Sequence, residues 1–365
     1  MPSGMDLKND VLNTSSCSLC GACLDWCPYL FNLEDRLIMR FDCNVQEGRC
    51  YSVCPRTMTD WEKINDQLFD GIPFSKEIGS HTAIHKAKAV ETVHKQQDGG
   101  TVSMLLQAVL KENVVSAALL TGSEDAITPY PFLSNKIEDI QLAAGSRFLA
   151  TPSLRKLIEA QDQGFEKIVV VARPCQVQAL RKMLGNWPPD QKPLDVLIIG
   201  LFCMWSLSWD FKRYLSEQYP GEHVERIVIP QHGMEVVTNK GIKQIPAEVV
   251  KKFIRPGCNY CLDMTSELAD ISVGSFEPEK GWNTVIVRSA KGQQLLDRAI
   301  NQGLIITHPY PEEEANRLKR ASYNKKRRGL QAIQEIQRAG QKPFIDLTNE
   351  RYQEILNDTE GKVNV

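Results

Sequence analysis

The 365-residue sequence lacks a strong net charge, a long apolar run and an apolar leader. Its formal charge of −2 gives no basic field, so no nucleic-acid partner is expected. No stretch reaches about 18 uninterrupted apolar residues, which predicts no membrane-spanning helix, while a peripheral position on a membrane complex stays open. Residues 1–16 lack the apolar core of a signal peptide, so the thiols are expected reduced in the cytoplasm rather than in disulfides.

Cysteine, in contrast, is abundant. Seven of the eleven cysteines lie within the first 54 residues, in two bursts that each end in Cys-Pro. The first burst has the spacing of the bacterial ferredoxin run, in which three close cysteines hold one iron–sulfur cluster and the fourth reaches another. Structural zinc is the alternative, but zinc sites usually pair two Cys or Cys/His knuckles, and no histidine precedes His81. The pattern therefore predicts a two-cluster module that transfers electrons.

The crossed ligation of ferredoxins predicts how these cysteines divide. The first cluster would be held by Cys17, Cys20, Cys23 and Cys54. The second would be held by Cys27, Cys43 and Cys50, one cysteine fewer than a cubane needs. The second burst is similar to the second half of the iron–sulfur subunits of succinate dehydrogenases, where such a shortage accompanies a three-iron cluster. The second cluster is therefore either [3Fe–4S], or a [4Fe–4S] cluster whose fourth ligand comes from Asp42, Asn44 or a partner.

The rest of the chain alternates helical and β-branched segments. Helices are predicted at residues 59–69, 101–111, 152–160, 175–184, 209–219, 293–302 and 312–339. Strands are predicted at residues 114–120, 168–172, 196–200, 227–230, 235–238, 271–274 and 285–288. This pattern indicates an α/β core with a largely parallel sheet, or an α+β fold once the iron–sulfur module is included. We interpret residues 1–72 as a ferredoxin-like domain, residues 74–95 as a polar connector and residues 346–365 as a C-terminal tail.

Four further cysteines lie beyond residue 170. Cys175 and Cys203 each follow a predicted strand, where α/β sheets place their ligands, and Cys258 and Cys261 form a CxxC pair. Together they would suffice for a further [4Fe–4S] cluster. The alternative is that Cys175 and Cys203 are buried core residues and that the CxxC is a redox pair or half of a zinc site.

Short segments between residues 88 and 326 resemble the coenzyme F420 hydrogenase/dehydrogenase β-subunit family. They are GGTVS at 99–103, AGSRF at 144–148, RPCQ at 173–176, FC at 202–203, CxxCxD at 258–263, ADISVG at 269–274 and GWNTVIVR at 281–288. Each segment is weak alone, and their order and spacing make the resemblance specific. The family usually has Gly-Thr-Pro-Cys-Gln where this chain has Ala-Arg-Pro-Cys-Gln, so Arg173 departs from it and would change which anion or electron carrier is accepted.

The resemblance implies a mixed α/β domain over residues 73–345, with FAD beside a [4Fe–4S] cluster and coenzyme F420 stacked near the flavin ring. The implied cofactor contacts are Gly99, Gly100, Thr101, Val102, Ser103, Ser146, Arg173, Pro174, Gln176, Gly274, Ser275, Trp282, Asn283, Thr284, Lys325 and Lys326. Two glycines before a helix fit this role, because free N–H groups at a helix N-terminus bind phosphate. Alternatively, the glycines form only a turn and Trp282 belongs to the core. The basic run at residues 317–328 is either a solvated helix face or a site for the diphosphate or polyglutamate of F420.

These features favour an electron-input subunit that oxidises an F420H2-type hydride carrier at FAD and passes single electrons through clusters to a partner, or the reverse. Expected partners are redox subunits of a hydrogenase, formate dehydrogenase, heterodisulfide-reductase-like or F420H2 dehydrogenase complex. The alternatives are an electron-transfer adaptor without hydride chemistry and a tetrapyrrole-type reductase of the same family. No catalytic side chain is assigned.

Overall fold

A mixed eight-stranded sheet organises the computed structural model, which describes residues 2–91, 97–229 and 233–358. In spatial order the strands are β13 (Ile305–Pro309), β3 (Ala83–Ala89), β12 (Asn283–Val287), β11 (Ile271–Ser275), β7 (Asp195–Leu201), β6 (Lys167–Ala172), β4 (Ala117–Ser123) and β5 (Pro129–Ser134). The central strands β11, β7, β6 and β4 run parallel, and every other pair is antiparallel. The expectation of a largely parallel sheet is therefore wrong outside these four strands.

The apolar runs of the central strands are explained by helices on both faces of the sheet. Helices α5 (Lys156–Asp162) and α6 (Pro174–Gly185) share one hydrophobic cluster with Ile168 and Val170. Helices α4 (Thr101–Lys111) and α9 (Ala290–Asn301) share the other cluster with Val169. The predicted helix at 101–111 is thereby confirmed as α4.

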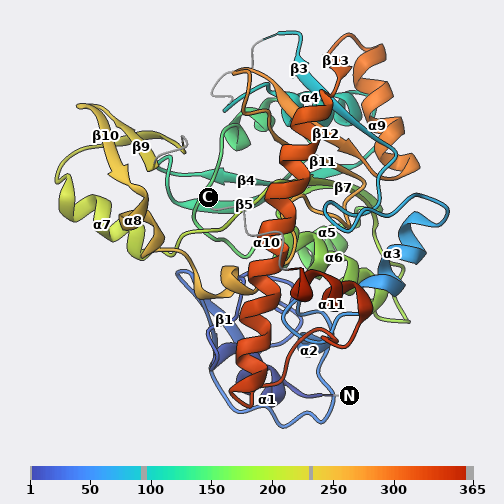
Figure 1. Cartoon of the computed structure of the whole chain (residues 1–365), viewed down its shortest axis with the longest axis vertical. Coiled ribbons are helices and arrows are strands. Elements are labelled where there is room, and N and C mark those ends of the chain that lie inside the picture. Colours follow the sequence, from blue (N-terminus) through green and yellow to red (C-terminus); the bar gives the residue numbers. More distant parts are fainter. Residues whose placement is uncertain (1, 92–96, 230–232, 359–365) are drawn as a thin grey trace.

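The N-terminal module forms the lower end of the molecule (Figure 1). It contains α1 (Gly4–Leu7), a π-helical turn (Lys8–Leu12), the hairpin β1 (Leu30–Leu33) and β2 (Arg36–Met39), α2 (Arg49–Ser52) and α3 (Trp61–Phe69). Leu7 and Val11 belong to the same hydrophobic cluster as Leu157 and Val177 of the core helices. The module therefore packs directly against the α5–α6 face of the sheet.

A side lobe holds the three-stranded sheet β8 (Val224–Val228), β9 (Gly233–Thr238) and β10 (Gly241–Pro246), with α7 (Asp210–Gln218) and α8 (Ala247–Lys251) (Figure 1). Short 3₁₀ turns cover Glu138–Ala143, Ser153–Arg155 and Pro256–Tyr260. Among the described segments, no helix combines the length and the apolar character needed to cross a membrane.

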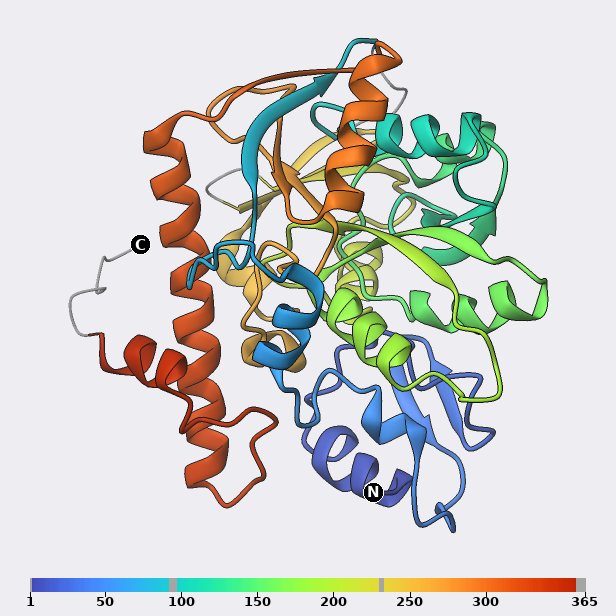
Figure 2. The same ribbon diagram turned by 90° about the vertical axis from the view of Figure 1, so that its right-hand side faces the viewer.

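The long helix α10 (Glu312–Arg338) runs along one side of the molecule from the sheet to the module, as predicted for residues 312–339 (Figure 2). After it, α11 (Glu350–Asn357) buries Ile355 against the core. The Thr59 amide donates to the Phe344 carbonyl (3.2 Å), and Arg351 pairs with Glu62 (3.0 Å). Residues 346–358 are thus a packed segment that holds the module rather than a tail, and 359–365 lie outside the described residues.

The expected connector at residues 74–95 contains β3, a strand inside the main sheet. Its sequence, AIHKAKA, lacks a clear apolar face. The amino groups of Lys86 and Lys88 lie 4.3 and 4.5 Å from the centre of the Trp282 ring, directly before β12. The methylene stems of these lysines therefore pack as apolar groups within a strand.

Candidate functional site

Two of the core thiols lie where neighbouring parallel strands end. Cys175 lies at the start of α6, directly after β6, and Cys203 follows β7. The turn Pro256–Tyr260 brings Cys258 to the same edge, where the Ser206 amide donates to its Sγ (3.3 Å). Because parallel strands end at one edge of a sheet, these thiols converge although they are distant in sequence.

Cys261 follows Cys258 in the same turn, and its amide donates to the Cys258 carbonyl (3.2 Å). Burial is the main cause that raises the pKa of the Cys203 thiol to about 12; Lys325 and Arg173 oppose it, and Cys258 and Cys175 contribute to it. Burial also raises the pKa of Cys258, with Cys175 and Cys261 adding to the shift. The structure therefore brings together the four cysteines of the core, which we name the core thiol group: Cys175, Cys203, Cys258 and Cys261.

Four thiols of the module line one small cavity. They are the inner thiol group: Cys17, Cys20, Cys23 and Cys54. The remaining wall is largely apolar and includes Leu7, Val11 and Leu24. Burial, together with the charge of Cys17, raises the pKa of Cys54 to about 11. The amides of Leu19 and Arg56 approach the sulfurs of Cys17 and Cys54 at 3.4 Å.

The other three module cysteines form the outer thiol group: Cys27, Cys43 and Cys50. Burial, together with the charges of Cys27 and Cys43, raises the pKa of Cys50 to about 12. Cys50 is buried, while Cys27 and Cys43 are partly exposed. The Asp42 carboxylate pairs with Lys8 (2.7 Å), and Asn44 is exposed.

The inner group lies between the other two. The charge of Cys175 contributes to the raised pKa of Cys20, and the charge of Cys54 contributes to that of Cys50. Contact between the module and the core is close here, because a Cβ on Gly257 would lie 2.4 Å from the Ser16 carbonyl oxygen. The three groups therefore follow one another in the order core, inner, outer.

Buried cations surround these thiols. The Arg56 side chain bridges module and core, donating to the Gly257 carbonyl (3.0 Å). Burial lowers the pKa of Arg56, but the charges of Cys261 and Cys175 outweigh burial and raise it overall. Arg56 therefore places a buried positive charge beside thiols of both the module and the core.

Helix α6 connects two thiol groups. Cys175 lies in its first turn, and near its other end Lys182 donates to the carbonyls of Cys54 (2.6 Å) and Met58 (3.0 Å). Gln178, one turn earlier, donates to the Pro55 carbonyl (3.3 Å). The same helix therefore carries a core thiol and holds the loop of an inner thiol.

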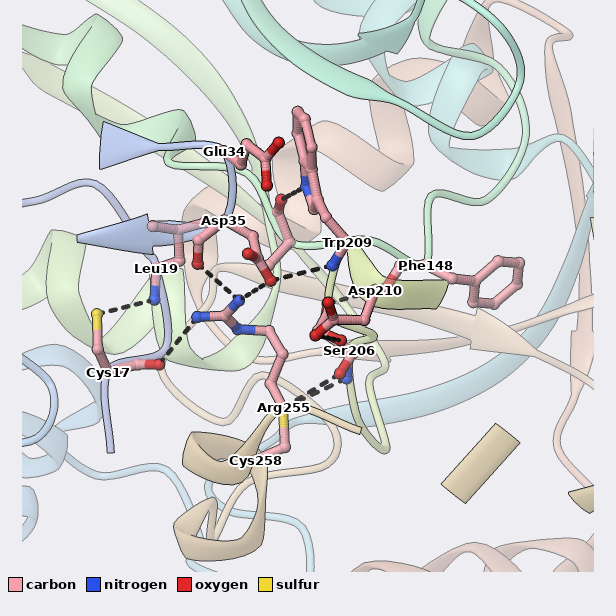
Figure 3. A network of polar contacts seen from close by, with 12 residues as sticks. Cys17, Leu19, Glu34, Asp35, Phe148, Ser206, Trp209, Asp210, Arg255 and Cys258 are labelled. Carbon is pink, nitrogen blue, oxygen red and sulfur yellow. Dashed lines mark hydrogen bonds and ion pairs between the residues drawn. The ribbon is translucent and has the colours of Figure 1, made fainter. Parts of the chain in front are cut away.

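Arg255 forms a second link between module and core (Figure 3). Its guanidinium donates to the Asp35 carboxylate (2.6 Å) and to the Cys17 carbonyl (3.4 Å). Its backbone carbonyl accepts from the Cys258 amide (2.9 Å). The sequence did not reveal the roles of four of these side chains, because their partners are more than a hundred residues away: Arg255, Arg56, Lys182 and Gln178. The one available signal was that Arg56 directly follows the second Cys-Pro pair.

Lys325 and Lys326 are buried and have internal partners. The Lys325 amino group donates to the carbonyls of Cys203 and Asp263, both at hydrogen-bonding distance. Lys326 pairs with Glu267 (2.9 Å) and donates to the Lys76 carbonyl (2.7 Å). Neither ammonium group is therefore presented to solvent, and Lys325 lies beside the core thiol group.

Arg173 caps α6 at the edge where the core thiols meet. Its Nη1 donates to the Ser206 hydroxyl (2.6 Å), while its Nη2 is buried without a hydrogen-bond partner among the described residues. Its charge opposes the raised pKa of Cys203 and Cys258. Of its predicted neighbours, Pro174 begins the helix, and Gln176 is buried with its Nε2 donating to the Thr151 carbonyl (3.3 Å).

The start of α4 is built around Asn283. Its Oδ1 accepts from the Thr101 amide (3.2 Å), and its Nδ2 donates to the Gly274 carbonyl (3.2 Å). A Cβ on Gly99 would lie 2.7 Å from this Oδ1, and Gly100 adopts the left-handed conformation with φ 70°. Both glycines are thus needed for packing and for the turn.

Two amides remain at this helix start. The backbone N–H groups of Val102 and Ser103 have no acceptor among the described residues, and both side chains are half-buried. Free N–H groups at the N-terminus of an 11-residue helix are suited to binding an anion. Two backbone donors are therefore free at the predicted helix start, whereas the Thr101 amide already donates to Asn283.

The remaining predicted cofactor contacts are dispersed. Thr284 is buried with its hydroxyl 3.2 Å from the Ser275 carbonyl, and Trp282 is buried between lysines of β3. The Ser275 hydroxyl donates to Asp98 (2.5 Å), and Ser146 is exposed. Among the described residues, no three His, Cys, Asp or Glu side chains are arranged to hold a single metal ion.

Comparison with known proteins gives two family matches. The models describe the N-terminal and C-terminal parts of the coenzyme F420 hydrogenase/dehydrogenase beta subunit, and they match residues 84–158 and 165–313. The coenzyme F420 hydrogenase subunit beta of Methanococcus voltae is 30% identical over 63% of this chain and 85% of its own. The coenzyme F420-dependent sulfite reductase of Methanocaldococcus jannaschii is 29% identical over 79% of this chain, which spans only 46% of that relative.

A solved structure is also similar. It is a chain in the F420-reducing [NiFe] hydrogenase complex from Methanosarcina barkeri, with a TM-score of 0.67 and 27% identity. The likeness covers 72% of this chain and 95% of the other.

Proposed function

Because the chain belongs to the coenzyme F420 hydrogenase/dehydrogenase beta-subunit family, we propose that it is the electron-input subunit of a redox complex. It oxidises reduced coenzyme F420, or a carrier of that type, and delivers single electrons to a partner oxidoreductase, or works in reverse. A bound flavin supplies the exchange between a hydride and single electrons, and iron–sulfur clusters carry the single electrons.

The convergence of eleven cysteines into three groups carries this proposal. The inner group opens into one cavity with a largely apolar wall, and backbone amides approach two of its sulfurs. Four thiolates with amide donors suit a [4Fe–4S] cluster, whose sulfurs accept such bonds. We assign [4Fe–4S] clusters to the inner and core groups, and a [3Fe–4S] or a differently completed [4Fe–4S] cluster to the outer group.

The buried cations support the assignment. Arg56, Lys182 and Lys325 each place a positive charge beside a thiol group and are themselves largely removed from water. A buried cation is costly unless an opposite charge accompanies it. Clusters with four thiolate ligands supply that negative charge, so the cations and the clusters stabilise each other.

The flavin assignment depends on the start of α4, where the Val102 and Ser103 amides are available to a phosphate. Thr101 and Asn283 act there as supports of the helix start rather than as direct contacts.

Anaerobic purification tests the proposal. We expect about 11 to 12 iron atoms per chain, from two four-iron clusters and a third cluster of three or four irons. We expect one extractable flavin, bleached by reduced F420 but not by NADH. A protein with iron and no flavin would instead be an electron-transfer adaptor, and a protein with about four irons would contradict the module assignment.

Cys258→Ala provides a local test. It should remove about four irons while the signals of the module clusters remain in low-temperature EPR spectra. Cys43→Ala is the matched variant and should affect only the outer group. A signal in the oxidised protein that Cys43→Ala abolishes would identify a three-iron cluster there.

A further inference from the structure

An unusual number of exposed apolar side chains lies around the outer thiol group. They form the hairpin patch: Phe31, Leu33, Ile38, Phe41 and Val45, each between 41% and 63% exposed. Soluble proteins rarely expose contiguous apolar surface of this kind unless it binds something. Neither the flavin site nor the three thiol groups requires this exposed apolar surface.

The patch is continuous because of strand register. Phe31 lies opposite Ile38, and Leu33 lies opposite Arg36, so these four side chains share the outer face of the β1–β2 hairpin. The Arg40 guanidinium carbon lies 5.9 Å from the Phe31 ring centre and 5.5 Å from that of Phe41, which joins the hairpin to the following loop.

Two partly exposed thiols lie at the base of this hairpin. Cys27 precedes β1, and its carbonyl accepts from the Leu30 amide (3.3 Å). Cys43 follows β2 between Phe41 and Val45. The hairpin patch thus surrounds the end of the thiol series that is nearest to solvent.

The charges at the patch are not balanced. Its acidic neighbours are neutralised, since Glu34 pairs with Arg213 (3.1 Å) and Asp42 with Lys8 (2.7 Å). Arg36 and Arg40 are exposed, and neither forms an ion pair with another described residue. An apolar centre with aromatic rings and unpaired arginines is typical of a protein interface whose partner has an acidic rim.

We propose that the hairpin patch docks an iron–sulfur protein whose own cluster lies under an acidic face with an apolar centre. This inference rests on the proposed function, because the outer group must hold a cluster. The docked partner in its oxidised form gains one electron from the reduced module, and no bond is made or broken and no proton moves.

The test uses an acidic two-cluster ferredoxin as the protein acceptor and methyl viologen as the small acceptor. The complete protein is reduced with dithionite, so the result does not depend on the flavin step. Phe31→Ser/Phe41→Ser and Arg36→Gln/Arg40→Gln should each lower the second-order rate of ferredoxin reduction about tenfold or more, with the arginine effect shrinking at high salt. Methyl viologen rates and iron content should stay unchanged, and so should all rates in the control Ile242→Ser, an exposed apolar residue of the side lobe.

Unchanged ferredoxin rates in the patch variants would overturn the inference, as would a wild-type protein that reduces methyl viologen but not ferredoxin. Wild-type binding to anionic phospholipid vesicles that the variants lose, with ferredoxin rates unaffected, would overturn it in favour of a membrane surface. Equal losses with both acceptors would place the effect inside the module and also overturn it. A wild-type module without iron would overturn the proposed function itself.

Discussion

The guanidinium of Arg255 lies 2.6 Å from the carboxylate of Asp35, and both side chains are almost completely buried. Arg255 belongs to the loop before Cys258, and Asp35 to the turn of the module hairpin. One ion pair therefore fixes the module against the loop that carries two core thiols.

Removing one partner of this pair should be costly. Arg255→Met leaves the Asp35 carboxylate buried without its counter-charge, which should lower the free energy of unfolding by about 3–5 kcal/mol. The adjacent exposed pair of Arg213 and Glu34 is the matched control, and Arg213→Met should cost less than about 1 kcal/mol. Urea denaturation of the anaerobic protein measures both. A recovery in Arg255→Met/Asp35→Asn would identify the unpaired charge as the cause.

Arg173 should raise the reduction potential of the cluster that we assign to the core thiol group. Its charge acts on Cys203 and Cys258, so it stabilises the more negative reduced state. Arg173→Thr, which introduces the residue usual in the family, should lower the equilibrium constant for reduction about tenfold, or about 59 mV for one electron. EPR-monitored redox titration measures this, with Arg173→Lys as the charge-retaining control. An unchanged reduction potential in Arg173→Thr would mean that the free Nη2 of Arg173 serves a ligand other than this cluster.

Ser103→Glu should remove the flavin without unfolding the protein. A carboxylate in the first turn of α4 favours the helix, but it repels a phosphate bound at the same amides. Gln107→Glu adds the same charge to the same helix further from its start. We expect flavin content to fall at least tenfold in Ser103→Glu and to stay unchanged in Gln107→Glu, with iron unchanged in both. Full flavin in Ser103→Glu would place the cofactor elsewhere.

Glu267 should make stability depend on pH. Burial raises its pKa to about 7, against the opposing charge of Lys326. Between its ordinary pKa and about 7 the folded protein retains a proton that the unfolded chain releases, so stability falls as pH rises through this window and levels off above it. From pH 5.5 to 7 the free energy of unfolding should fall by about 1–2 kcal/mol, because the slope of 1.36 kcal/mol per pH unit already declines near the pKa. Glu267→Gln should lack this slope, and an equal slope in the variant would contradict the assignment.

Local patterns predicted several elements well. The helix at residues 101–111 agrees with α4 because apolar residues recur at helical spacing after a Gly-Gly turn. Cys17, Cys20, Cys23 and Cys54, which the spacing assigns to one cluster, line one cavity, and their role as ligands stays a prediction. Cysteines that are close in sequence, or that follow neighbouring parallel strands, can occupy only a few positions relative to one another.

Other features depended on distant partners. β3 was missed because two lysines interrupt its apolar pattern. Lys86 and Lys88 are covered by the distant Trp282 ring, and Lys86 also pairs with Glu279. Lys325 was expected near a phosphate, yet it donates to the carbonyl of Cys203, more than a hundred residues away. A run of basic residues in a sequence does not reveal which of their side chains are buried.

Helix α6 fixes a distance as well as a fold. Electron tunnelling slows steeply as the gap between two redox centres widens, so any motion of one centre against the other would make the rate fluctuate. Cys175 and the loop of Cys54 are both held by this one rigid helix, through Lys182 and Gln178. Under the cluster assignment proposed above, this helix would hold the step between the core and inner groups at a nearly constant length.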